Sequence, residues 1–370
     1  MKALSHQLIN TNSQKLLQIT LTDKKLISET GTPKKLRKTE KEFSSSEEAL
    51  KNFYKKEWAA LKKDFVLNNK HPKIGEAYLH KFIGGGYTGS LSFQHTPKGI
   101  FIYKDEVDSL IQIDEFGTVY DEIKLPKQLA WNIVYRGHTN SLILDIDHYI
   151  YEYELDHKSF RNLGNKKSFI DSFISVADNK TAFATLGKVS IINNLNILLW
   201  KKNYTLQNIK GTTPFCGKLS KDGKLLAFHN TVGELQIINA TNGKHLNTIT
   251  GSFEMITQIE FTNNNKLLVI REKYGTWGMR YFDLSNNQEI IIQSLEIPTN
   301  TKNINTFCFN NNQSKLVLVQ HSNVFVFDFI NKTLLHNFNI EHLVKTCEIK
   351  FIGEKLGIRT DYGCFSLYNV

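Results

Sequence analysis

A short pattern recurs seven times along the chain at nearly constant spacing, and this repetition constrains the fold more than any other feature. Each copy is an apolar run that ends in a characteristic pair of residues. The seven pairs are Ile113-Asp114, Tyr153-Glu154, Ile192-Asn193, Ile238-Asn239, Phe282-Asp283, Phe327-Asp328 and Tyr368-Asn369. Successive pairs are separated by 39 to 46 residues. A period of about 40–45 residues built from short strands is typical of a β-propeller.

A second landmark repeats in step with the first. A polar residue opens an apolar strand at Lys98, Asn140, Lys180, Lys224, Lys266, Lys315 and Lys355. In the clearest copy, Asp222-Gly223 supplies a turn between two strands, because glycine adopts a positive φ without a Cβ clash. Two landmarks that share one period predict a mainly β fold, with a seven-bladed β-propeller over residues 71–370.

The repeat around this turn resembles the WD-repeat propeller family. It reads Ser-Lys-Asp-Gly-Lys-Leu-Leu-Ala-Phe and continues into Leu-Gln-Ile-Ile-Asn-Ala-Thr-Asn-Gly-Lys, and the likeness covers about residues 73–370. The chain has no Trp-Asp pair, so the resemblance implies the architecture without the family's hydrogen-bond network. The last repeat lacks an outer strand. We expect residues 76–82 to supply it, because unpaired strand edges promote aggregation.

Residues 1–70 differ from the repeats in both charge and predicted elements. They hold 15 Lys or Arg and 8 Asp or Glu, which is a net charge of +7 out of +10 for the whole chain. The basic character is therefore concentrated in a small N-terminal domain. Apolar runs and turn residues predict short strands at 16–21, 25–28, 41–43 and 65–67, with a turn at 31–33.

A helix is predicted between the third and fourth of these strands. Ser45 and Glu48 fit a capping box, in which both side chains satisfy free backbone N–H groups at the helix start. Helical spacing places five apolar side chains near one face, namely Leu50, Phe53, Tyr54, Trp58 and Leu61. Pro72 disfavours helix at the residue before it, so residues 68–72 are predicted to link this domain to the propeller.

This order of strands and helix resembles the WGR domain family over about residues 4–67. The resemblance is carried by Thr30-Gly31-Thr32, by Lys41-Glu42-Phe43-Ser44 before the helix, and by the closing Lys62-Lys63-Asp64-Phe65-Val66. It implies an α+β fold, and some members of the family bind DNA. The Trp-Gly-Arg positions fall on Ile27-Ser28-Glu29, and a glutamate in place of the arginine would repel phosphate.

The strongest charge feature of the N-terminal domain is a set of basic residues around its predicted turns. As a nucleic-acid site it would consist of Lys24, Lys25, Lys34, Lys35, Arg37 and Lys38. Several cations that contact phosphates release counterions, which favours binding. No aromatic side chain lies between these residues to stack on bases. The alternative interpretation is a solvated loop that keeps a sheet edge soluble.

A second candidate surface lies in the fifth repeat, between its second and third predicted strands. The residues from Arg271 to Gly278 form the longest such connection, and a protein partner would contact Arg271, Lys273, Tyr274 and Trp277. Arg, Tyr and Trp contribute most to interface energies when they lose water. The alternative is that the tryptophan folds back onto its own blade.

Motifs of enzymes and metal sites are absent from the sequence. It contains no nucleophile elbow, no phosphate loop and no His-Glu-x-x-His, and Asp145, Asp147 and His148 are interpreted as a polar loop. The cysteines lack metal-ligand spacing, and we expect Cys216, Cys308 and Cys347 to be buried in first strands. We therefore expect no catalytic residues, no bound metal and no cofactor.

These features favour a non-catalytic scaffold that presents a rigid propeller face to protein partners. The alternative is a nucleic-acid-associated protein that binds through residues 1–70 and recruits partners through the propeller. A propeller enzyme with acidic residues in its channel is a third class. The chain has neither an 18-residue apolar stretch nor a signal-peptide core, so we expect a cytoplasmic location and no membrane association.

Overall fold

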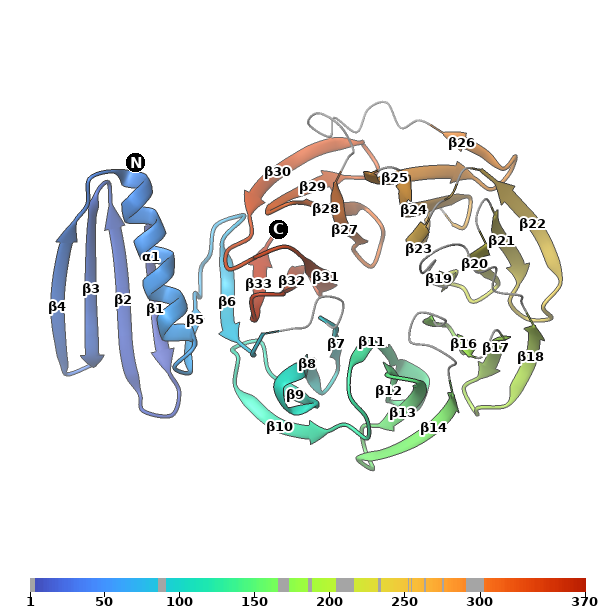
Figure 1. Cartoon of the computed structure of the whole chain (residues 1–370), viewed down its shortest axis with the longest axis horizontal. Helices are drawn as coiled ribbons and strands as arrows, with labels where there is room; N and C mark the ends of the chain where they lie inside the picture. The colour runs from blue at the N-terminus through green and yellow to red at the C-terminus, as the bar shows by residue number, and fades with distance from the viewer. Residues whose placement is uncertain are drawn as a thin grey trace.

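A computed structural model gives the arrangement of most of the chain, and its fold is mainly β (Figure 1). It describes residues 4–85, 91–165, 173–185, 188–203, 216–231, 234–251, 253, 255–262, 264–274, 276–290 and 303–370. Small antiparallel sheets surround a central axis as in a β-propeller, and an N-terminal module lies beside this ring (Figure 1). None of the helices in the described part of the chain is both long and apolar enough to span a membrane.

Six separate sheets of four strands make up most of the ring. The first three sheets contain β7 Phe93–Thr96, β8 Gly99–Lys104, β9 Ser109–Ile113, β10 Val119–Lys124; β11 Ala130–Arg136, β12 Ser141–Ile146, β13 Tyr149–Glu154, β14 Ser159–Asn165; β15 Ile174–Ala177, β16 Lys180–Thr185, β17 Lys188–Asn193 and β18 Leu198–Asn203. The next three contain β19 Cys216–Leu219, β20 Leu225–Thr231, β21 Glu234–Asn239, β22 His245–Thr250; β23 Met255–Thr262, β24 Leu267–Tyr274, β25 Thr276–Asp283, β26 Gln288–Ile290; β27 Ile304–Phe309, β28 Lys315–Gln320, β29 Asn323–Asp328 and β30 Thr333–Asn339. Neighbouring strands of each sheet are consecutive in the chain, so the predicted repeat corresponds to a meander.

Second strands such as β12 and β28 are short, mostly apolar runs because the sheets stack face to face. Every residue of β12 is buried, and four successive residues of β28 are buried. A strand that is covered on both faces does not need alternating polar residues. First strands of successive sheets contact one another in the order β7, β11, β15, β19 and β23.

The N-terminal module is a four-stranded meander covered on one face by a helix. Its elements are β1 Leu4–Asn10, β2 Lys15–Thr22, β3 Lys25–Thr32, β4 Lys35–Glu42, α1 Ser46–Leu61 and β5 Phe65–Asn68. The predicted helix is confirmed, and the Ser45 side chain accepts a hydrogen bond from the Glu48 N–H at 3.1 Å. The Glu48 carboxylate in turn accepts from the Ser44 N–H at 3.2 Å. One predicted core position is wrong: Leu50 is exposed, because it lies beside the apolar face of α1 and not on it.

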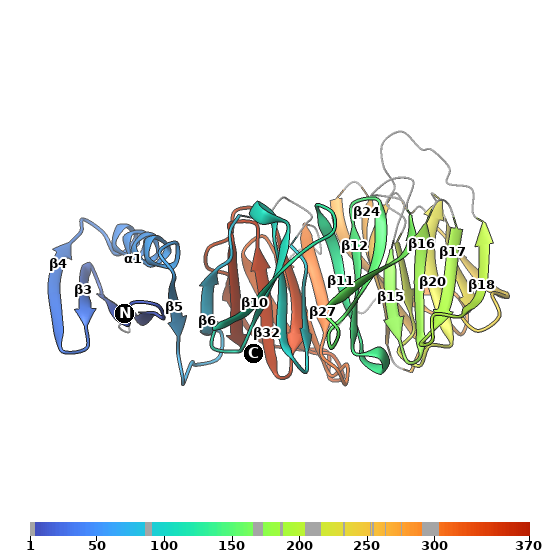
Figure 2. The ribbon, with the colours of Figure 1, turned by 90° about the horizontal axis from the view of Figure 1, so that it is seen from below.

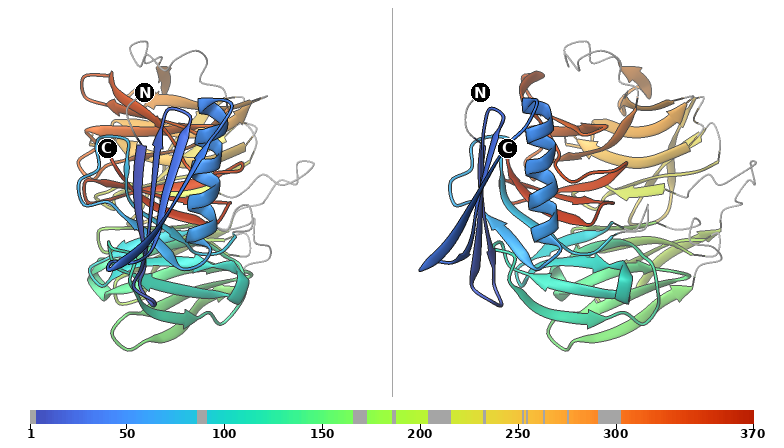
Figure 3. Two further views of the ribbon diagram at one scale, coloured as in Figure 1. Left: turned by 90° about the vertical axis from the view of Figure 1, so that its left-hand side faces the viewer. Right: turned by 60° about the vertical axis from the view of Figure 1, so that its left-hand side comes forward.

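One continuous sheet joins the module to the propeller. Its nine strands run in the order β31 (Cys347–Ile352), β32 (Lys355–Thr360), β33 (Cys364–Asn369), β6 (Ala77–Phe82), β5, β1, β2, β3, β4. Strand β6 pairs with β33 on one side and with β5 on the other. Figure 2 and Figure 3 show the module at the edge of the disc, with α1 on one face of its sheet.

A single apolar core crosses the junction between module and propeller. Phe53 and Trp58 of α1 belong to the same buried cluster as Ile349, Leu356 and Tyr368 of the propeller. Because this core and the nine-stranded sheet both cross the junction, the two parts cannot move independently without exposing apolar side chains to water.

Two predicted loops are strands in the structure. The basic run that contains Lys35, Arg37 and Lys38 lies in β4. This strand begins at Lys35, six residues before the strand predicted at 41–43. The predicted loop from Arg271 to Gly278 is a β-hairpin, in which β24 extends to Tyr274 and β25 begins at Thr276. In both cases the ladder of backbone hydrogen bonds to a neighbouring strand overrides the polar composition.

The three cysteines lie in first strands as predicted, but only Cys347 is fully buried, while Cys216 and Cys308 are partly exposed. Cys216, Cys308 and Cys347 are in the first strands of their sheets, β19, β27 and β31, and all four cysteines of the chain are free thiols. Burial raises the pKa of the Cys216 thiol to about 12 and also raises the pKa of Cys308 and Cys347. These three thiols therefore contribute apolar packing and have little thiolate character.

Candidate functional site

The structure distributes the six candidate nucleic-acid residues over several parts of the module. All six are exposed. Lys24 lies in the turn between β2 and β3, whereas Lys34 lies in the turn between β3 and β4. These turns are at opposite ends of an eight-residue strand, which is roughly 26 Å long. The six residues therefore do not form one continuous patch.

Strand pairing confines the acidic side chains of β3 and β4 to one face, whereas basic side chains lie on both faces. Leu26 is opposite Lys41, Ser28 opposite Thr39, and Thr30 opposite Arg37. Residues that are directly opposite share a face, so these pairs, with Lys35, are on the face that carries α1. The remaining pairs place Lys25, Lys38, Glu29, Glu40 and Glu42 on the other face.

The second face is locally neutralised. Glu40 accepts charge-assisted hydrogen bonds from Lys25 and Lys38, each at 2.6 Å. These two bonds lower the pKa of the Glu40 carboxyl to about 2. Because their charges are paired, Lys25 and Lys38 are poorer phosphate ligands than the basic residues on the helix-bearing face.

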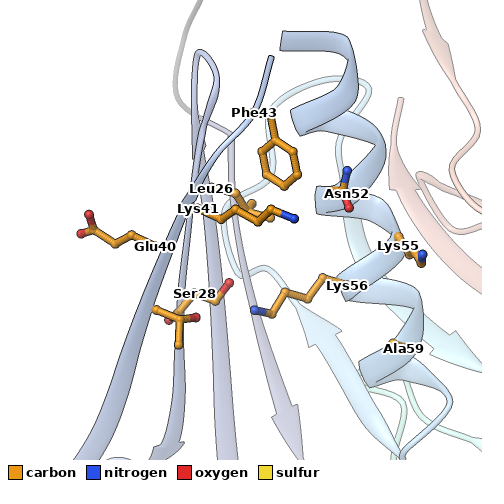
Figure 4. A pocket seen from close by; sticks show the side chains of 10 residues that line it. Leu26, Ser28, Glu40, Lys41, Phe43, Asn52, Lys55, Lys56 and Ala59 are labelled. Atoms are coloured by element: carbon orange, nitrogen blue, oxygen red, sulfur yellow. The ribbon is translucent and has the colours of Figure 1, made fainter. Parts of the chain in front are cut away.

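A groove of about 490 Å³ opens on the helix-bearing face, between α1 and strands β3 and β4. Its lining includes Ser28, Lys41, Asn52 and Lys56. Figure 4 shows the Lys41 and Lys56 side chains extending toward each other across this groove, while the Glu40 side chain points away from the helix. The Lys41 ammonium lies 4.8 Å from the centre of the Phe43 ring. Partial burial lowers the pKa of Lys56.

Sequence reasoning missed the contribution of the helix to this groove. Asn52, Lys56 and Ala59 are spaced four and three residues apart, so they form a stripe along α1 beside its apolar face. That spacing was a readable signal. What could not be read was that α1 contacts β2 and β3 and leaves the outer strand β4 uncovered, which opens the groove.

The candidate partner surface is at the end of the β24–β25 hairpin. Lys273 is paired with Trp277, and Tyr274 with Thr276. The side chains of these three candidate residues lie outside the described part of the structure. Arg271 is engaged within the propeller, since its Nε donates to the Ile304 carbonyl at 2.7 Å. Burial lowers the pKa of Arg271 to about 10.

A cluster of histidines and glutamates lies at the junction between module and propeller, and sequence reasoning did not identify it. Its members are His6 of β1, Glu57 of α1, His80 of β6, and Glu341 and His342 after β30. We call these five residues the junction cluster. The only readable signal was Glu57, a charged residue four positions after Phe53 on the apolar face of α1.

Short polar contacts connect the junction cluster. His6 Nδ1 lies 3.0 Å from Glu57 Oε2, and His80 Nε2 lies 2.7 Å from Glu341 Oε2. The Glu57 and His80 side chains are completely buried. The Tyr54 hydroxyl donates to Glu341 Oε1 at 3.1 Å. The cluster thus links β1 and α1 of the module to the propeller.

Burial and the His–Glu contacts shift the pKa values of Glu57 and His6 in opposite directions. Burial would raise the pKa of Glu57, but His342 and His6 outweigh burial and lower it. Burial would likewise lower the pKa of His6, but its contact with Glu57 raises it. The Trp58 ring covers the cluster, since it stacks on His342 at a centroid distance of 4.9 Å.

The side chains of Asp145, Asp147 and His148, which the sequence analysis interprets as a polar loop, do not point to a common site. Asp145 lies in β12 and is buried, whereas His148 is exposed and lies 3.5 Å from Asp147. Among the described residues, the one group of His, Cys, Asp and Glu side chains placed to hold a metal ion is His6, Glu57 and Glu341.

The chain matches no known protein-family model and no curated protein.

Proposed function

We propose that this chain is a non-catalytic interaction scaffold that presents one face of a rigid propeller to protein partners. The observation that carries the proposal is the nine-stranded sheet, which holds the module and the propeller in one fixed arrangement. Fixed geometry allows two binding surfaces to be presented at a constant separation, which favours simultaneous binding.

The finer description of the fold is part of this proposal. We take β31, β32, β33 and β6 as a seventh blade of WD-like type, with β6 as the outer strand that residues 76–82 were expected to provide. Contacts of β31 with both β27 and β7 support closure of the ring. The meander, helix and last strand of the module support a WGR-like domain over residues 1–70.

Affinity purification of the tagged full-length chain from its native lysate tests the scaffold. The lysate is treated with nuclease, and wild type is compared with a Tyr274→Ala, Trp277→Ala double variant. We expect co-purified proteins whose recovery saturates with the amount of tagged chain. Their recovery should persist after nuclease treatment and should be lower with the double variant. Phe116→Ala is the matched control, because Phe116 is also an aromatic residue of the propeller and is 63% exposed. Equal recovery with all three proteins would contradict a partner site on the hairpin.

A second candidate function is nucleic-acid association through the N-terminal module. The segregation of charge supports it, since Lys41, Lys56 and Arg37 line or flank the groove face while the acidic residues of β3 and β4 lie on the opposite face. A cationic groove between a helix and a strand can follow a phosphate backbone, and its affinity then falls as salt increases.

Fluorescence anisotropy with labelled single-stranded and double-stranded oligonucleotides measures this binding at several salt concentrations. For duplex DNA, the slope of log affinity against log salt is about −0.9 for each phosphate contacted, so three groove cations predict a slope near −3. Replacing Arg37, Lys41 and Lys56 by alanine should abolish that slope. The Lys25→Ala, Lys38→Ala control changes the opposite face. A control that weakens binding as much as the groove variant would refute the assignment.

A further inference from the structure

The junction cluster contains donor atoms of the kinds that transition metals bind. His6, Glu57 and Glu341 each offer one ligand atom, and these three atoms all lie within 4.8 Å of one another. Imidazole nitrogen and carboxylate oxygen are ordinary ligands of zinc and similar divalent ions. The residues belong to three segments far apart in the sequence, so only the folded junction brings them together.

Two further atoms in the cluster have no hydrogen-bond partner among the described residues. They are Glu57 Oε1 and His342 Nε2, and both belong to side chains that are at least 96% buried. The two atoms face each other at 3.7 Å, which is too long for a hydrogen bond. A buried polar atom without a hydrogen-bond partner destabilises the fold, because it has lost its contact with water and gained no other partner. One ion at about 2 Å from each atom would satisfy both.

Outer contacts hold the carboxylate of Glu341 in place. Tyr54 donates to one oxygen at 3.1 Å, and His80 lies 2.7 Å from the other. His80 is itself fixed by Ser366, whose hydroxyl lies 2.7 Å from His80 Nδ1. Metal ligands in proteins are commonly oriented by such neighbours, and each carboxylate oxygen keeps a second lone pair for the ion.

We propose that His6, Glu57 and Glu341 bind one divalent ion of the zinc class, with His342 beside Glu57 as the fourth donor, and that this ion fastens the N-terminal module to the propeller. Four protein ligands with no open position are typical of a structural site. The two carboxylates balance the charge of the ion. This inference departs from the sequence-based expectation of no metal, and it is independent of the scaffold and nucleic-acid proposals.

The test uses the full chain with an affinity tag that contains no histidine. Metal content is measured by mass spectrometry after purification without chelator. The chelator-treated protein is then titrated with Zn²⁺ against a chromophoric competitor, and separately with Co²⁺, whose visible absorption reports four-coordinate binding. We expect one ion per chain and a higher Tm with Zn²⁺. Glu57→Gln should weaken binding by at least about tenfold, since it removes an anionic ligand.

Two variants complete the design. Glu154→Gln is the matched control, because His157 and Glu154 also lie 3.0 Å apart but the histidine is exposed. It should bind like wild type. If Glu57→Gln does not fold, Glu341→Gln replaces it, since Glu341 is less buried. The proposal is overturned if folded wild type binds no stoichiometric Zn²⁺ or Co²⁺. In that case, His–Glu hydrogen bonds and ion pairs hold the cluster together without a metal. Equal affinity in wild type and the ligand variants would overturn it too.

Discussion

Replacement of Trp58 by alanine tests whether the module and the propeller form one cooperative unit. Trp58 belongs to α1, but its ring stacks on Tyr362 of the propeller at a centroid distance of 4.4 Å and on His342 at 4.9 Å. Its side chain is 7% exposed. The substitution removes this contact from the centre of the junction and leaves the backbone pairing of β5 with β6 intact.

The expected loss of stability follows from the burial of the ring. Truncating a buried tryptophan to alanine costs about 3–5 kcal/mol. Unfolding entropy is about 2.1 cal/mol/K per residue, so over 370 residues a loss of about 4 kcal/mol lowers the Tm by about 5 °C. The indole Nε1 has no hydrogen-bond partner among the described residues, so Trp58→Phe should cost much less.

Differential scanning calorimetry and urea unfolding followed by circular dichroism measure these changes. The wild type should unfold in a single transition, because one core spans the junction. A double-mutant cycle of Trp58→Ala with Tyr362→Ala isolates the stacking energy, which should be about 0.5–1.5 kcal/mol. A loss below about 1 kcal/mol for Trp58→Ala, or two separate wild-type transitions, would falsify the single-unit argument.

Three other predictions concern single residues. Gly99→Ala should destabilise the chain by about 1–3 kcal/mol in urea unfolding, because Gly99 has φ +123° and an added Cβ would lie 2.6 Å from the Ile113 carbonyl oxygen; an unchanged midpoint would contradict this. Cys216 should resist alkylation in the native protein at pH 8 and react after denaturation, since its pKa is raised to about 12; mass spectrometry of the labelled peptides decides. The Glu40 carboxyl should titrate near pH 2 by NMR, and because its folded pKa lies below its unfolded value, the stabilising pairing with Lys25 is complete above about pH 4.5 and is lost as the pH falls toward 2; a midpoint near 4.5 would refute the pairing.

Local patterns in the sequence were sufficient to predict the repeated strands and the helix start. The turn at Asp222-Gly223 and the cap at Ser45 depend on residues within a few positions of each other, so their physics is local. The strand limits of the module were less accurate. The polar run in β4 has no apolar face of its own, and it is a strand because it pairs with β3 along its whole length.

The candidate sites depended on contacts that no linear pattern contains. Of the six basic residues, Lys24 and Lys34 lie in two different turns, and the two-residue period of a strand divides the other four between two faces. The groove needs Lys56 from the helix as well as Lys41 from the strand. The junction cluster depends on still longer separations, since His80 and Glu341 are 261 residues apart.

Short-range patterns are enough to predict repeated antiparallel sheets and a basic N-terminal module, because turns, caps and apolar periods act between near neighbours. The sharing of β6 between the two parts, and the burial of Glu57 among histidines at their junction, appear only in the folded chain. The physical reason is that a strand edge or a buried charge takes whichever partner the folded chain brings within hydrogen-bond distance. That partner is set by the packing of distant segments.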